Sequence, residues 1–199
     1  MRPVRLTRAE QQALTRERLL AAAERVLAGH GYGGASIDLV TAEAGYSKGA
    51  IYSNFESKEA VFLELLRVYM ERDTAELGRI VSLAPHRLSA ALSAWLETMH
   101  ADSDCPLLMT ELQLHARRNP VFAERYYALQ DQQTRALAGI LKRFFKAQSA
   151  ALPMDPLDLA GSMTALAHGL TLQRPQGKPG APSSAGRVIG TMLKLLTQR

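Results

Sequence analysis

Cysteines, long apolar runs and strand-like alternation are scarce in this sequence of 199 residues, and each scarcity excludes a class of protein. Cys105 is the single cysteine, which excludes an internal disulfide and a zinc site built from several cysteines. No apolar run approaches the roughly 20 residues that cross a bilayer, and no apolar stretch follows the charged first residues as in a signal peptide. We therefore expect a cytoplasmic protein with no membrane partner.

Motifs of catalysis are missing as well. The five histidines are dispersed, without the spacing of a metal site, at His30, His86, His100, His115 and His168. No glycine-rich phosphate loop follows a strand pattern, and Cys105 lacks a catalytic setting. We expect neither an enzyme nor a metal or cofactor site.

The net charge of +5 is modest and unevenly placed. The first 60 residues are nearly neutral, with eight Lys or Arg against seven Asp or Glu. Within them, Arg2, Arg5 and Arg8 form a basic arm without an acid. Such an arm can follow DNA phosphates, but a solvated disordered tail would have the same composition. Charge alone leaves nucleic-acid binding open.

Apolar residues recur with a helical period along most of the chain, which predicts an all-α fold of about nine helices. Thr7 and Glu10 can form a capping box that opens the first helix, and the glycine-rich stretch 29–34 ends it. Asn119-Pro120 and Asp155-Pro156 are typical helix starts. Residues 174–184 are rich in Pro, Gly and Ser and predict a flexible loop.

Residues 37–55 predict a helix-turn-helix. Gly45 separates two short helices, and a serine can cap each helix of the region: Ser36 before 37–44, Ser47 before 48–54, and Ser57 before a long helix to about residue 83. The first short helix would bury Ile37, Val40 and Ala44, and the second Ile51 and Phe55.

The second short helix would expose a mixed polar face, made of Lys48, Gly49, Ala50, Tyr52, Ser53 and Asn54. Small residues let the backbone approach DNA, Ser and Asn can bond to base edges, and Lys and Tyr can reach phosphates. A three-helix connection inside an ordinary bundle would show the same periodicity, so the pattern leaves both interpretations open.

The stretch 44–55, AGYSKGAIYSNF, followed by SKEA at 57–60, resembles the DNA-binding signature of the tetracycline-repressor (TetR) family. AAAERVL at 21–27 and the break at Gly31-Tyr32 before Ser36-Ile37 are similar to the family's first helix and turn. The resemblance covers about residues 15–75. One departure is Val40-Thr41, where the family commonly has isoleucine and alanine; the Thr41 hydroxyl could touch a phosphate or face solvent.

The resemblance implies a regulator of transcription that binds double-stranded DNA. Phosphate contacts would come from Tyr52 and Lys58, with Ser36 and Thr41 as further candidates. Base edges would be met by Lys48, Gly49, Ala50 and Ser53. Ser47 and Asn54 belong to the same surface, and Tyr46 either joins it or packs on the helix pair. The implied parts are an arm with the start of the first helix (1–14), a DNA-binding domain (15–75, helix-turn-helix at about 37–56) and a regulatory and dimerisation domain (76–199).

Two such modules related by a twofold axis would read a palindromic operator, so we expect a homodimer. Small residues recur every four positions in the last two predicted helices, through which family members pair. The predicted contact residues are Gly161, Ala165, Gly169, Gly186, Ile189, Gly190 and Leu193. Both helices could instead only cap the core of the monomer.

The resemblance also implies an effector pocket in the second domain, for an apolar molecule with a few polar groups. The candidate lining residues, each also explicable as ordinary core, are Trp95, Met99, His100, Met109, Leu112, His115, Phe122, Tyr126 and Met163. The implied function is a repressor that a small apolar effector releases from its operator. The alternatives are a helical interaction protein and a regulator without a small-molecule effector.

Overall fold

A computed structural model of the chain describes residues 7–99, 105–173 and 183–198, and these residues form nine helices without a strand. The all-α prediction is therefore confirmed. The helices are α1 (Arg8–Gly34), α2 (Ile37–Ala44), α3 (Lys48–Tyr52), α4 (Lys58–Ile80), α5 (Pro85–Thr98), α6 (Cys105–Ala116), α7 (Pro120–Ala147), α8 (Pro156–Leu172) and α9 (Ser184–Thr197). Over the same stretches, none combines the length and apolarity that a bilayer crossing requires.

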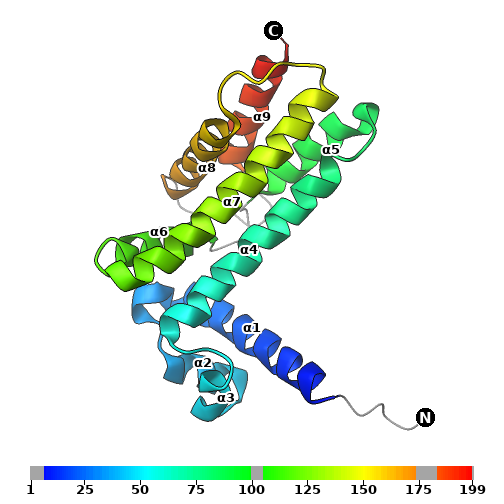
Figure 1. Ribbon diagram of the computed structural model, residues 1–199. Coiled ribbons are helices and arrows are strands. Elements are labelled where there is room, and N and C mark those ends of the chain that lie inside the picture. The colour runs from blue at the N-terminus through cyan, green and yellow to red at the C-terminus, as the bar shows by residue number, and fades with distance from the viewer. Residues whose placement is uncertain (1–6, 100–104, 174–182, 199) are drawn as a thin grey trace, which may run out of the picture.

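Two hydrophobic clusters stabilise the fold, and α4 and α7 run through both (Figure 1). The first cluster lies between α1, α2, α3, the first half of α4, α6 and the start of α7. The second lies between the end of α4, α5, the second half of α7, α8 and α9. Helices α2 and α3 thus lie at one end of the molecule, and α8 and α9 at the other.

Side-chain caps start the helices of the first half as the sequence predicts. Thr7 forms both bonds of its capping box with Glu10, and the hydroxyls of Ser36, Ser47 and Ser57 each accept a backbone N–H of the following turn. Asn119 behaves differently, because its amide donates to the His115 carbonyl (2.9 Å) instead of capping α7.

Helix α4 ends at Ile80, before the predicted residue 83. The hydrogen bonds there change to the tighter 3₁₀ pattern, because the N–H groups of Ser82 and Leu83 donate to carbonyls three residues earlier, at 3.2 and 3.0 Å. Pro85 starts α5 and disfavours helical backbone at Ala84, whose ψ is 145°. Similarly, α3 closes at Tyr52, two residues before its predicted end.

A break at Gly31 lets α6 dock against the end of α1. Gly31 has φ 63° and ψ 174°, a region open essentially to glycine alone. The break frees the N–H of Tyr32, which donates to the Glu111 carboxylate of α6 at 2.5 Å. The Tyr32 ring packs edge-on against Phe62 and His115, with centroids 5.4 and 5.6 Å away. Helix α6 is therefore fixed to the helices that carry α2 and α3.

Gly31→Ala should lower the free energy of unfolding by about 1–3 kcal/mol, because alanine is strained at this φ and ψ. Its Cβ would also lie 3.1 Å from a Glu111 carboxylate oxygen. Gly29→Ala is the matched control: this exposed helical glycine has nothing within 4 Å of a Cβ, so alanine should be neutral or stabilise by up to about 1 kcal/mol. Urea unfolding followed by circular dichroism measures both, and equal effects would contradict the assigned role of Gly31.

Candidate functional site

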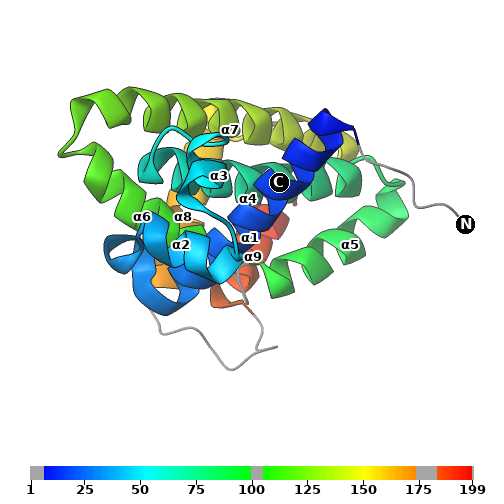
Figure 2. The same cartoon turned by 90° about the horizontal axis from the view of Figure 1, so that it is seen from below.

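Helices α2 and α3 form a helix-turn-helix at the exposed end of the molecule (Figure 2). Gly45 ends α2 in the left-handed conformation, with φ 69° and ψ 28°. Tyr46 then donates its N–H to the Thr41 carbonyl at 3.1 Å, and the Ser47 hydroxyl accepts from Ala50 at 3.3 Å to start α3. The predicted layout is confirmed.

The inner faces of both helices anchor them to the first cluster. Val40 and Ile51 are fully buried, Phe55 is nearly so, and Ile37 and Ala44 pack against the cluster as half-buried residues. These positions are the ones that the periodicity predicts.

Arg16 of α1 fixes the far end of α3, a role that the sequence does not reveal. Its guanidinium donates to the Asn54 carbonyl at 2.7 Å, lies 4.2 Å from the centre of the Phe55 ring and pairs with Glu64 of α4 at 2.9 Å. The hydrogen bond of Arg67, and after it that of Arg16, lowers the pKa of Glu64 to about 2, so this carboxylate is ionised at neutral pH. One side chain thus ties α3 to both α1 and α4.

The outer face of α3 is open. Lys48, Gly49, Tyr52 and Ser53 are exposed, Tyr52 by 58%, and Ala50 is half-buried. Among the described residues, a Cβ at Gly49 would meet only the Ser47 hydroxyl, at 3.6 Å, so no other described residue covers this backbone. Lys48 pairs with Asp38 at 2.6 Å, but both side chains are more than 60% exposed, and such a pair exchanges partners at little cost.

Two side chains of the predicted polar face already bond to the backbone of α3. The Ser53 hydroxyl donates to the Ala50 carbonyl at 3.0 Å, and the Asn54 amide donates to the same carbonyl at 2.8 Å. Each would exchange this local bond for a bond to DNA. Ser36 and Ser47 use their oxygens as caps, which leaves the hydroxyl hydrogens available to donate.

Thr41 does not face solvent, which was one of the two positions expected for its hydroxyl. It is only 7% exposed, and its hydroxyl donates to the Asp38 carbonyl at 2.9 Å. The reason is its register: Thr41 follows Ile37 by four residues and therefore lies on the inward face of α2.

Lys58 and Tyr46 are held by side-chain contacts within the chain. The Lys58 ammonium donates to the Tyr32 carbonyl at 2.6 Å and lies 4.3 Å from the centre of the Tyr32 ring. Burial lowers the pKa of Lys58, so a phosphate contact requires this half-buried amine to leave Tyr32. The Tyr46 hydroxyl accepts from Arg18 at 3.3 Å, and its ring packs against the first cluster. Arg2 and Arg5 of the arm lie outside the described residues, and Arg8 opens α1.

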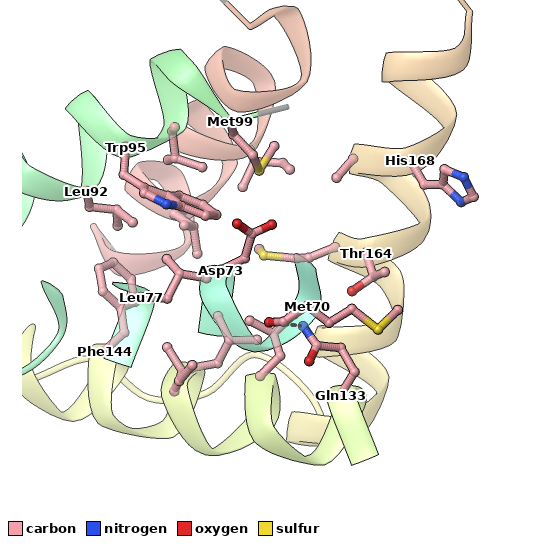
Figure 3. A pocket seen from close by; sticks show the side chains of 18 of the residues that line it. Met70, Asp73, Leu77, Leu92, Trp95, Met99, Gln133, Phe144, Thr164 and His168 are labelled. Atoms are coloured by element: carbon pink, nitrogen blue, oxygen red, sulfur yellow. Dashed lines mark hydrogen bonds between the residues drawn. The ribbon is translucent and has the colours of Figure 1, made fainter. Parts of the chain in front are cut away.

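A cavity of about 140 Å³ lies inside the second half of the molecule, between α4, α5, α6, α7, α8 and α9 (Figure 3). Its wall is mostly apolar and includes four of the predicted lining residues, Trp95, Met99, Met109 and Met163. The wall also contains polar side chains that the sequence interpretation missed, which are Asp73, Gln133, Thr164 and His168.

Four predicted lining residues belong to the first cluster instead. Leu112, His115, Phe122 and Tyr126 pack near the Gly31 break and do not line the cavity. The His115 ring lies 4.9 Å from Phe122, and its Nε2 lies 3.6 Å from a Glu59 oxygen. Helical periodicity marks a residue as inward but does not say toward which cluster, which explains the error. His100 lies outside the described residues.

Asp73 and His168 occupy different parts of the cavity wall. The Asp73 carboxylate points toward the middle of the cavity, whereas the His168 ring points away from it (Figure 3). His168 Nε2 lies 2.8 Å from both the Pro106 carbonyl and the Thr110 hydroxyl, which ties α8 to α6. Asp73 follows Met70 by three residues and precedes Leu77 by four, so the inward stripe of α4 could have predicted it.

The small residues of α8 and α9 separate into two groups. Among the described residues, none lies within 4 Å of a Cβ at Gly161 or Gly169, and Ala165 is exposed, so these residues leave this face of α8 open. Gly186 instead packs on α5, because its Cβ would lie 1.7 Å from the Leu96 carbonyl oxygen.

The other α9 residues that were predicted for a dimer contact also face inward. Ile189 and Leu193 are buried and line the cavity, and a Cβ at Gly190 would lie 3.3 Å from the Leu96 side chain. The exposed apolar side chains of α9 are Val188, Met192 and Leu195. Close α5–α9 packing within the chain accounts for the small residues of α9.

Sequence comparisons match the helix-turn-helix region to known regulators. Residues 19–65 match the family described as bacterial regulatory proteins, tetR family. The HTH-type transcriptional repressor AcnR of Corynebacterium glutamicum is 31% identical over 112 residues, which are 56% of this chain and 56% of that protein. The match thus spans about half the length of this relative.

Structural comparison extends the likeness to nearly the whole chain. A structure from Mesorhizobium loti assigned to the TetR family has a TM-score of 0.71 and 16% identity, over 97% of this chain and 98% of that one. A TetR-family regulator from Agrobacterium tumefaciens has a TM-score of 0.66 and 20% identity, over 93% and 98%. At this identity the likeness shows a shared fold. Residues 19–65 thus match the DNA-binding region of the tetR family, and the described helices share the fold of regulators assigned to that family.

Proposed function

We propose that the protein is a cytoplasmic, homodimeric repressor of transcription that binds a palindromic operator and leaves it when a small molecule enters the cavity. The observation that carries this proposal is the outer face of α3, which is exposed around Gly49 while Arg16 fixes its far end. A helix held rigidly and uncovered can enter a major groove. Repression is supported by the related AcnR, which is a repressor.

The dimer contact is proposed on the open faces of α8 and α9. One α3 offers few base contacts, and a twofold pair doubles them. Small residues of α8 allow close approach of a second copy, and exposed apolar side chains of α9 would be buried by it. The proposed contact residues are Gly161, Ala165 and Gly169 of α8 with Val188, Met192 and Leu195 of α9.

Release from DNA is proposed to act through α4. This helix lines the cavity with Met70, Asp73 and Leu77, and it receives the Arg16 bond at Glu64. A ligand that favours one position of α4 would change the separation of the two α3 helices in the dimer. It can do so only by binding the two states with different affinities.

A binding selection from random duplex DNA tests the core of the proposal. The recovered motif should be an inverted repeat with half-sites about one helical turn apart, or a multiple of it. A gel shift on the DNA upstream of the protein's own gene gives an independent result. Failure to bind any duplex at low salt would favour a helical interaction protein instead.

Tyr52→Ala should weaken binding by about tenfold on every duplex, because it removes a contact to the sequence-independent phosphates. Ser53→Ala should change the ranking of bases at particular operator positions and leave non-specific binding nearly unchanged. Fluorescence anisotropy with the operator and with single-base variants measures both. Uniform losses of the same size for the two variants would contradict these roles.

Ala165→Arg should convert the dimer to a monomer, because a guanidinium at the close contact of α8 would be buried without a partner. Operator affinity should fall with it. Ala136→Arg is the matched control, since Ala136 is an exposed alanine of α7, a helix outside the proposed contact. Sedimentation velocity distinguishes the two states. A dimeric Ala165→Arg protein would refute this interface while leaving DNA binding by α3 intact.

A further inference from the structure

We propose that Asp38 is a specificity-determining residue of the helix-turn-helix, which recognises one G·C base pair of the operator together with Lys48. Lys48 donates to the O6 and N7 atoms of the guanine, and the Asp38 carboxylate accepts from the N4 amino group of the paired cytosine. The inference rests on the proposed function and deepens it, because it assigns a base pair to two named side chains. Asp38 is not among the residues that the sequence predicts for DNA binding.

Asp38 and Lys48 lie at the N-terminal ends of the two helices. Asp38 is in the first turn of α2, and Lys48 is the first residue of α3. The Lys48 Nζ lies 2.6 Å from the Asp38 Oδ1, and the two side chains remain 63% and 67% exposed. The N-terminal residues of a recognition helix are the ones that meet base edges. This ion pair therefore lies where the proposed function requires bases to be recognised.

The partner of Asp38 distinguishes it from the other paired acid of α2. Glu43 pairs with Arg25 of α1, so its bond ties α2 to a helix outside the helix-turn-helix. Among the described residues, Asp38 and Lys48 form the one ion pair that joins α2 to α3. A side chain of the recognition helix thus holds the Asp38 carboxylate beside its own first turn.

A carboxylate at this position costs affinity for most DNA sequences. The first helix of a helix-turn-helix crosses the phosphate backbone, and phosphates repel an acid there. The cost is offset where the DNA presents a hydrogen-bond donor to the carboxylate. In the major groove the donors are the N4 amino group of cytosine and the N6 amino group of adenine. Asp38 therefore selects for these bases by penalising sites that lack them.

The lysine beside it favours a G·C pair over an A·T pair. Guanine presents two neighbouring acceptors, O6 and N7, which are the commonest base contacts of arginine and lysine. Guanine O6 and cytosine N4 are hydrogen-bonded to each other within the base pair, so they lie about 2.9 Å apart. The Lys48 Nζ and the Asp38 Oδ1 have a similar separation, 2.6 Å. The ion pair can thus meet one G·C pair, amine to guanine and carboxylate to cytosine, without coming apart.

The surroundings of the ion pair allow a base pair to approach it. Gly49 follows Lys48 without a side chain, and among the described residues only the Ser47 hydroxyl would contact a Cβ there. The hydrogen bond to Asp38, and after it the charge of Asp38, raise the pKa of Lys48, so the amine keeps its charge at neutral pH. Because both side chains are mostly in water, they can bond to bases at little cost.

Binding selections from random duplex DNA, made with the intact protein and with variants, test the inference. The intact protein should prefer one G·C pair in each half-site about tenfold over the other base pairs. Asp38→Ala should reduce this preference to less than about threefold, because the cytosine amino group loses its acceptor. It should also bind non-specific duplex more tightly, since a repulsive charge is gone. Lys48→Met should relax the same position.

Glu43→Ala is the matched control, because Glu43 is an exposed acid of α2 whose partner is Arg25 of α1. It should also bind non-specific duplex more tightly, but it should keep the ranking of bases. Thermal unfolding confirms that the variants are folded. If Asp38 only stabilises the N-terminus of α2, Asp38→Ala lowers the melting temperature and leaves the ranking unchanged, which overturns the inference.

Two further results would overturn it: selection of an A·T pair at the position that Asp38→Ala relaxes, or relaxation of different positions in the Asp38 and Lys48 variants. The proposed function can fail or survive separately. An intact protein that selects an inverted repeat with a ranking indifferent to Asp38→Ala keeps the proposed function and refutes this inference alone. An intact protein that selects no duplex refutes both.

Discussion

Helix α4 is the element on which the rest of the structure depends, because it belongs to both hydrophobic clusters. Its first half packs against α1 with Val61, Phe62, Leu65 and Leu66, and its last turn packs in the second cluster with Ile80. A continuous helix transmits displacement along its axis with little loss, since each turn is hydrogen-bonded to the next. Both clusters therefore share α4 as a common wall.

Four polar contacts connect that shared helix to its neighbours. Arg16 joins Glu64 of α4 to the Asn54 carbonyl at the end of α3. On the other side of the DNA-binding helices, the Tyr32 N–H donates to Glu111 of α6 and the Tyr32 carbonyl accepts from Lys58 of α4. Part-buried contacts of this kind cost free energy when one partner leaves, because the other polar group then loses its bond. They fix α4 and α6 to the helices around α3.

The ends of the helices could be predicted from the sequence. Which cluster or cavity an inward-facing residue joins could not. Ser36, Gly45 and Ser47 set the bounds of α2 and the start of α3 through bonds that span at most five residues, so the sequence contains the whole interaction. The same periodicity that marks Met109 and Leu112 as inward cannot say that one lines the cavity and the other does not. Likewise, Gly161 and Gly186 look alike in sequence, although only Gly186 has the Leu96 backbone against it. Arg16 was missed because all its partners are 38 or more residues away.

The charges around α2 and α3 are consistent with the proposed pairing of two modules. Lys48 pairs with Asp38, Arg25 with Glu43, and Arg125 with Glu56, all at exposed positions. Each cation that turns to a phosphate leaves an acid behind on the same surface, and that acid repels the DNA. The net electrostatic gain per module is thus smaller than a count of cations suggests, and non-specific binding by one module should be weak at physiological salt. In the proposed dimer, affinity would then come from close approach at Gly49 and from simultaneous binding of two copies, whose effective concentrations would depend on the rigidity of the dimer. A rigid spacing would make binding strong when it fits the operator, and a small displacement of α4 would then be enough to end it.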